Sequence, residues 1–98
     1  MTSARKIRDL TSFQGKAALY ELSEPTTFVD LGVTRETYFV VVSAIVFPPY
    51  RQTEETMIFP ANAEGEIVSW LELHGVRGSL SHAQAIYEAG WKLEENFQ

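Results

Sequence analysis

The stretch TYFVVVSAIVF, residues 37–47, decides the fold of this 98-residue chain. It is rich in β-branched and aromatic residues, which are enriched in strands. It is also too short to cross a bilayer as a helix, which takes roughly 20 apolar residues. We therefore expect residues 37–47 to form one long β-strand.

Both faces of this strand are apolar, because successive side chains alternate between the two sides of a sheet. One face holds Tyr38, Val40, Val42, Ala44 and Val46, and the other holds Phe39, Val41, Ser43, Ile45 and Phe47. Such a strand needs cover on both sides. A helix at residues 81–89 can cover one side. The other side needs the N-terminal segment together with Trp70, or a second copy of the chain, so a homodimer is one expectation.

A strand is also expected at residues 16–22, where apolar side chains fall on both faces. Pro25 should end it, since proline cannot donate to a sheet ladder. Residues 23–36 then read as a connection with turn signals, including Asp30-Leu31-Gly32.

The segment after Pro48-Pro49 should return along the 37–47 strand. Residues 55–59 are close in sequence and are expected to pair with it antiparallel. A turn is expected at 62–65. Residues 66–73 fit either a short strand or an irregular stretch whose Trp70 and Leu73 fill the core, and residues 74–78 read as a loop.

The clearest helix covers residues 81–89. Ser81 and Gln84 match a capping box, and Gly90 is a typical stop. The apolar stripe is expected to hold Leu80, Ala83 and Tyr87, with Ile86 beside it. A short helix or a flexible arm is expected within residues 1–13, since Ile7, Leu10 and Phe13 recur every three positions.

These elements predict a single domain over residues 1–98 with an α+β fold. A small antiparallel sheet of three to four strands would have one main C-terminal helix packed on one face. A hydrophobic content of 45% is enough for a core in a chain of this length.

Composition excludes several classes of function. The chain has no cysteine, which rules out disulfides, zinc–thiolate sites and thiol catalysis. A net charge of −5 argues against nucleic-acid binding, which needs clustered Lys and Arg. No stretch predicts a membrane span or a signal peptide, so a cytoplasmic location is the expectation. The spacing of His74 and His82 matches no common metal-ligand pattern, and no cofactor is predicted.

The Gly-rich stretch 74–81 opens into the expected helix and is a candidate ligand site. Its side chains for this purpose are His74, Arg77, Ser79 and Ser81. Glycines let backbone amides approach an anion, and the Arg77 guanidinium suits a phosphate or carboxylate. The alternative is a plain loop that uses glycine for turns and Ser81 as a helix cap.

A hydrolytic site is a further alternative. Ser79 or Ser81 would pair with His74 or His82, with Glu72 orienting the imidazole. No Gly-x-Ser-x-Gly motif accompanies them, and the chain is not expected to be an enzyme.

Protein contact is the other candidate role. Tyr50 and Arg51 follow the rigid Pro48-Pro49 pair, and both residue types are enriched in interface hot spots. Phe39 and Phe47, on the less well covered face of the 37–47 strand, are further candidates.

Several segments also resemble small uncharacterised proteins of actinobacteria and their phages. They are KAALYEL (16–22), YFVVVSA (38–44), IFPA (58–61), GEI (65–67) and GSLSHA (78–83). The resemblance implies a phage or mobile-element setting, in which small proteins often bind a host or viral protein. Because both faces of the 37–47 strand are apolar and no coherent catalytic set is present in the sequence, we expect a non-enzymatic binding module that acts on a protein partner. The alternative is a small-ligand or nucleotide binder that uses residues 74–81.

Overall fold

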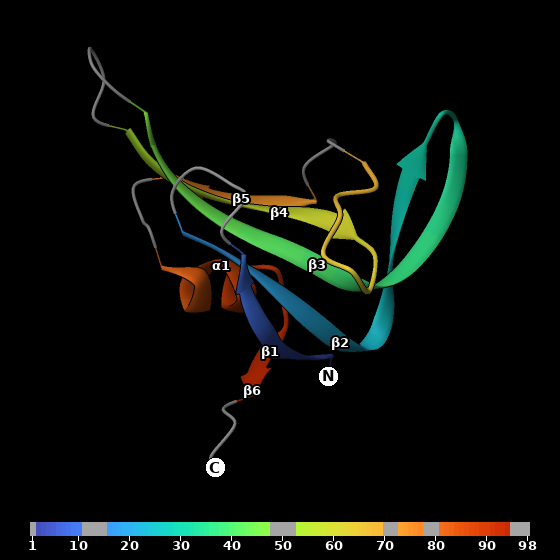
Figure 1. The fold of residues 1–98 in the computed structure, drawn as a ribbon, viewed down its shortest axis with the longest axis horizontal. Coiled ribbons are helices and arrows are strands. Elements are labelled where there is room, and N and C mark those ends of the chain that lie inside the picture. The colour runs from blue at the N-terminus through green and yellow to red at the C-terminus, as the bar shows by residue number, and fades with distance from the viewer. Residues whose placement is uncertain (1, 11–15, 48–52, 70–72, 78–80, 95–98) are drawn as a thin grey trace.

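Six strands and one helix make up the part of the chain that the computed structural model describes, residues 2–10, 16–47, 53–69, 73–77 and 81–94 (Figure 1). The strands are β1 (Ser3–Leu10), β2 (Lys16–Asp30), β3 (Val33–Phe47), β4 (Thr53–Ala61), β5 (His74–Arg77) and β6 (Lys92–Glu94), and the helix is α1 (His82–Glu88). One sheet contains all six strands in the order β5-β4-β3-β2-β1-β6. Neighbours are antiparallel except β1 and β6, which are parallel.

The predicted α+β fold with a small antiparallel sheet is wrong. The described chain is mostly sheet, and the sheet is mixed because β6 runs parallel to β1. Two segments account for most of the difference. Residues 3–10, predicted as helical or flexible, form β1, and residues 74–77, predicted as a loop, form β5. The helix has only seven residues, so it is a minor part of the architecture.

β3 is an interior strand, as predicted from its composition. It lies between β2 and β4 and pairs with both over most of its length. Val40, Val41 and Val42 are fully buried. The strand begins at Val33, four positions earlier than predicted, and β4 returns antiparallel to it, as expected.

The two faces of the sheet are covered by different parts of the same chain. On one face, Val40, Val42 and Tyr20 share the larger core cluster with Ala85 and Ile86 of α1. Leu73, Ala89, Trp91 and Leu93 pack against the edge of this cluster. The other face has a smaller cluster that includes Leu19 and Val41, with Leu10, Phe39 and Ile67 packed on it.

The loop after β4 is fixed by Asn62. The Asn62 Oδ1 atom accepts from the backbone amides of Glu64 and Glu66, both at 3.0 Å. Gly65 lies at the closest approach of this loop to the sheet. Its φ is +85°, and an added Cβ would lie 3.1 Å from Arg8 and from Leu10. The predicted turn at 62–65 is confirmed, and it brings the loop onto the smaller cluster.

β1 is a strand where a helix was predicted, because it pairs with β2 and β6, and its ladder with β2 contains an irregularity. Lys6 pairs with Tyr20 and Arg8 pairs with Leu19, so Ile7 is an extra residue. A bulge of this kind breaks the two-residue alternation of a strand. The three-residue spacing of Ile7 and Leu10, which is typical of a helix, is therefore compatible with a bulged strand.

α1 begins as predicted. Ser81 is the N-cap, and its hydroxyl oxygen accepts from the Gln84 amide at 3.1 Å. Gly90 follows the helix with φ +88°. The predicted apolar stripe is wrong, because Ala85 and Ile86 face the sheet while Tyr87 is 79% exposed.

Pro25 does not end β2, contrary to the prediction. Pairing between β2 and β3 shifts between Glu21–Phe39 and Thr26–Thr37, so Pro25 lies within an irregularity of the ladder. Proline is tolerated at such positions because no ladder hydrogen bond is needed there. The strand continues to Asp30 and gives the sheet a long hairpin.

Candidate functional site

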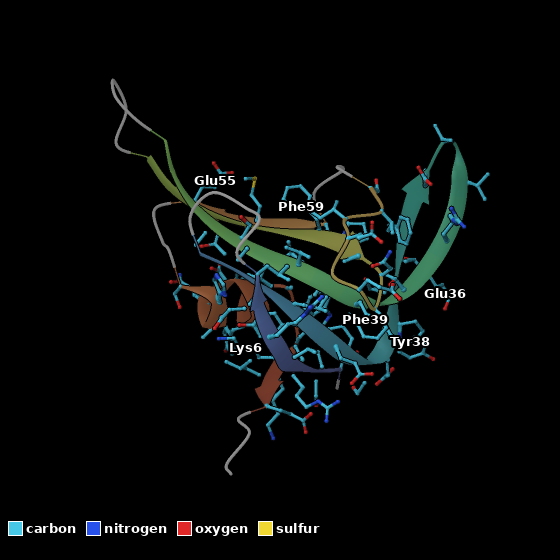
Figure 2. The ribbon with its side chains drawn as sticks, in the orientation of Figure 1. Lys6, Glu36, Tyr38, Phe39, Glu55 and Phe59 are labelled. Atoms are coloured by element: carbon cyan, nitrogen blue, oxygen red, sulfur yellow. The ribbon has the colours of Figure 1, made fainter. Side chains whose placement is uncertain are left out.

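The outer half of the β2–β3 hairpin, residues 26–37, stands away from the rest of the sheet (Figure 1). We call this segment the arm. Bulges bend strands, and the arm changes direction next to the pairing irregularity at residues 22–25. Figure 2 shows Glu36 on the arm, with Tyr38 and Phe39 where the arm joins the body. The arm is thus a projection built from two strands whose inner halves lie in the core.

The arm ends in a two-residue turn. Leu31 has φ +50° and Gly32 has φ +77°. Two positive φ values in succession are typical of a type I′ hairpin turn, which favours Asn, Asp or Gly at both positions. A leucine in the left-handed region is strained, because its Cβ lies close to the following carbonyl oxygen.

Apolar side chains surround this turn. Leu31 is 96% exposed, Val33 is 59% exposed and Val29 is 50% exposed. We call these three residues the arm tip. No other place in the described residues combines a strained backbone with a bulky apolar side chain in solvent.

The base of the arm is fixed to the body. The Thr37 hydroxyl donates to the Ala61 carbonyl oxygen of β4 at 2.6 Å, and it accepts from the Phe39 amide at 3.1 Å. Nearer the turn, the Arg35 guanidinium forms an ion pair with the Asp30 carboxylate at 3.3 Å. The Thr37 contacts therefore attach the arm base to β4, and the Asp30–Arg35 pair joins the two strands of the arm to each other.

A second feature lies at α1 and β6. It is a depression of about 790 Å³, and we call it the α1–β6 depression. Its apolar lining comes from Ala83 and Tyr87 on the helix and from Trp91 and Leu93 after it. Gln84, Glu88 and Lys92 add polar groups to its lining.

Of the four predicted ligand-binding residues, the three that the structure describes lie on two elements, β5 and the start of α1. His74 and Arg77 are the first and last residues of β5, and Ser79 lies outside the described residues. Ser81 is the helix N-cap. β5 is an edge strand, so the backbone of residues 74–77 belongs to a ladder with β4 rather than to a loop.

Two of the groups considered for hydrolysis, Ser81 and His82, have structural partners. The Ser81 hydroxyl oxygen accepts the Gln84 amide, and His82 Nδ1 lies 3.3 Å from the Tyr20 hydroxyl. Burial raises the pKa of the Tyr20 phenol to about 12, with a smaller effect from the Asp9 carboxylate. Glu72 lies outside the described residues.

The predicted protein-contact residues have mixed positions. Tyr50 and Arg51 lie outside the described residues, and Phe47 is the last residue of β3. Phe39 packs against the smaller core cluster. Sequence reasoning missed Leu31 as a site, although the turn signal at residues 30–32 between two extended segments marks a hairpin.

Comparison with known proteins found no match among protein-family models, curated proteins or solved structures. In the described ranges, no group of three or more His, Asp or Glu side chains is placed to hold a metal ion. The helix seen there is also far short of the length needed to cross a bilayer. The resemblance to actinobacterial and phage proteins therefore stays a prediction.

Proposed function

We propose that this protein is a non-enzymatic binding module that contacts a protein partner through the arm tip. The observation that carries the proposal is Leu31, which is strained in its backbone and 96% exposed. The resemblance to small phage and actinobacterial proteins supports a host or viral protein as the partner.

Leu31 contributes little to the fold. The left-handed conformation costs a leucine roughly 1–2 kcal/mol, and an exposed side chain gains nothing from burial to offset that cost. Asn or Gly at this position would suit the turn better. A residue that strains the backbone and makes no stabilising contact in return is typical of functional positions.

The apolar surface of the arm tip is too small to account for binding by itself. Burying an aliphatic side chain completely gains about 1.5–3 kcal/mol, and Val29 and Val33 have only 50% and 59% of their surface left to bury. The three residues therefore supply less than the roughly 8 kcal/mol of a micromolar complex. We expect the flanks of the arm, including the half-exposed Tyr38, to contribute the rest.

The test uses the purified chain as bait in a lysate of the organism that encodes it, with captured proteins identified by mass spectrometry. We expect a protein captured by the wild type to be lost with Leu31→Asn, which keeps the turn but removes the apolar group. Leu31→Met is the matched control and should keep the capture. Equal capture by the wild type and Leu31→Asn would overturn the proposal.

A further inference from the structure

We infer that the arm binds its partner by pairing an extended segment of that partner with the outer edge of β3, at residues 33–36. We call this stretch the arm edge. The inference rests on the proposed function, because it specifies how the flank of the arm adds to the contact made by the arm tip. The partner that fits is a segment of a different protein in which a basic side chain stands among β-branched residues.

The sheet leaves the arm edge without a neighbouring strand. β4 pairs with β3 only over residues 39–47, and the bond from the Thr37 hydroxyl to the Ala61 carbonyl oxygen lies where this pairing ends. Figure 1 shows β3 as the outer border of the arm. Within the described residues, the backbone of 33–36 has no backbone partner outside its ladder with β2. Such an edge is a template for a strand from another chain.

The turn determines which backbone groups of the arm edge point outward. In a two-residue hairpin, the residues that flank the turn form a hydrogen-bonded pair, and the two kinds of pair then alternate along the ladder. Val33 follows the turn and pairs with Asp30, so these two residues form the hydrogen-bonded pair. The N–H and C=O groups of Thr34 and Glu36 therefore point away from β2 and can bond to an added strand.

The other open edges in the described part of the sheet carry features that hinder pairing. β5 and β6 are only four and three residues long. The part of β1 beyond β6 has its bulge at Ile7, between the charged residues Lys6 and Arg8. The β2 edge of the arm begins next to Pro25. Short strands, bulges, lysines and prolines are the usual means of blocking an exposed edge, and none of them occurs at residues 33–36.

The side chains of the arm edge indicate the chemistry of the partner segment. Arg35 is paired with Asp30 across the ladder at 3.3 Å, so its charge is neutralised within the arm. Glu36 is exposed and forms no ion pair with any described residue. Opposite charges directly across a ladder stabilise each other, and β-branched residues suit a position beside Thr34. We therefore expect a Lys or Arg opposite Glu36, with β-branched neighbours.

A second copy of the chain does not supply this chemistry. Two arm edges related by a two-fold axis would pair antiparallel. The register that uses the outward groups of both copies places Thr34 opposite Glu36, so the carboxylate gains no basic partner. Each copy also carries a net charge of −5, and the copies repel one another. The arm edge thus favours a basic segment of a different protein.

A phage-displayed library of random peptides, selected on the purified chain, is the probe. We expect the selected peptides to combine β-branched residues with Lys or Arg. Selection on Glu36→Lys should replace these basic residues with Asp or Glu, because the charge across the ladder is reversed. Peptides with the same charge from both selections would contradict the role of Glu36 and overturn the inference.

Thr34→Pro tests the backbone pairing with a selected peptide, and fluorescence anisotropy measures the binding. Proline at position 34 removes an outward N–H and leaves the ladder with β2 intact, so binding should weaken by about tenfold or more. Thr27→Pro is the matched control, since Thr27 is also exposed and pairs with Glu36, but directs its N–H to the β2 edge. The control should bind like the wild type. Circular dichroism checks that both variants fold.

Amide hydrogen exchange of the wild-type chain, followed by NMR, gives a readout without any substitution. We expect the bound peptide to slow exchange at Thr34 and Glu36, whose amides gain acceptors, and to leave Thr27 and Val29 on the other edge unchanged. Equal binding by the two proline variants, equal protection of both edges, or a selection that yields no peptide would each overturn the inference.

These outcomes separate the inference from the proposed function. If a protein captured from the lysate is lost with Leu31→Asn but kept by Thr34→Pro, the arm tip binds it without an added strand, and only the inference is wrong. If a selected peptide depends on Thr34 while capture does not depend on Leu31, the arm edge binds without the arm tip, and only the proposed function fails. If neither residue affects binding, both proposals fail.

Discussion

The inner and outer halves of the β2–β3 ladder are built from the same two strands but differ in their surroundings. In the inner half, residues 17–21 pair with residues 39–43, and Leu19, Val41 and Val42 are fully buried. In the outer half, residues 26–30 pair with residues 33–37, and most side chains lie in solvent. The same backbone pairing thus serves a core on one side of the irregularity and a projecting arm on the other.

This difference shows that strand pairing alone does not determine whether a strand contributes to the core or projects into solvent. The inner half is stabilised by apolar burial on both faces, whereas in the outer half Phe28 is buried and the rest of the support comes from the ladder, the turn and the contacts at Thr37. Substitutions in the inner half should therefore act on stability, and those at the arm tip should act on binding.

The largest difference in stability is expected between two variants that carry the same type of substitution, leucine to alanine, one in each half of the ladder. Leu19→Ala removes a fully buried side chain from the smaller cluster and should lower the free energy of unfolding by about 2–5 kcal/mol. Leu31→Ala should change it by less than about 0.5 kcal/mol, as is usual at exposed positions. Urea denaturation measures both. Similar losses at the two positions would contradict the division between core and arm.

Glycines at positive φ give the second contrast. Gly65→Ala and Gly32→Ala both place a Cβ in the left-handed region, at a cost of roughly 1–2 kcal/mol each. At Gly65 the new methyl group also crowds Arg8 and Leu10, whereas nothing lies within 4 Å at Gly32. We expect Gly65→Ala to lose about 1 kcal/mol more stability than Gly32→Ala in thermal or urea unfolding. The opposite order would show that the loop packs more loosely.

Tyrosine ionisation probes the burial of the inner half. The raised pKa of Tyr20 means that the folded state favours the neutral phenol, so stability is intact below pH 10 and is lost as the pH rises toward 12. The full loss is about 3 kcal/mol, since one pKa unit corresponds to about 1.4 kcal/mol. We expect the free energy of unfolding, measured by urea denaturation, to fall less for Tyr20→Phe than for the wild type as the pH rises from 10 toward 12. Tyr38→Phe, at the half-exposed arm base, is the control, and an equal fall in all three proteins would be the contrary result.

The smallest effect is expected at the turn itself. Leu31→Asn should raise the free energy of unfolding by up to about 1 kcal/mol, because asparagine adopts the left-handed conformation more readily than leucine. The midpoint of urea denaturation should rise with an unchanged slope. A variant that is more stable but no longer binds would identify Leu31 as a residue kept for function. A loss of stability would show that the leucine supports the fold.

Sequence reasoning located the elements whose signals are local. The run at 37–47 predicted β3 because β-branched residues on both faces need an interior position. The capping-box spacing of Ser81 and Gln84 predicted the start of α1, and in the structure the Ser81 hydroxyl oxygen accepts from the Gln84 amide. The return of β4 followed from the short separation after Pro48-Pro49.

The elements that were missed depend on partners far along the chain. Pro25 was expected to end a strand because proline cannot donate a hydrogen bond to a regular ladder. The irregularity that accommodates Pro25 lies in the pairing of β2 with β3. The bulge at Ile7 hid β1 in the same way. The exposed tip of the arm followed from neither composition nor spacing, since exposure depends on where the covering segments end.

The parallel ladder between β1 and β6 affects the order in which the chain folds. The Lys92 amide donates to the Thr2 carbonyl oxygen at 2.8 Å, so this ladder connects residues near the two ends of the described chain. Closing so long a loop is entropically costly, and such contacts form late. β1 can therefore acquire its outer neighbour only after nearly all of the described chain has been synthesised. We expect β6 amides to exchange with deuterated solvent before those of β3, and equal protection would argue against late closure.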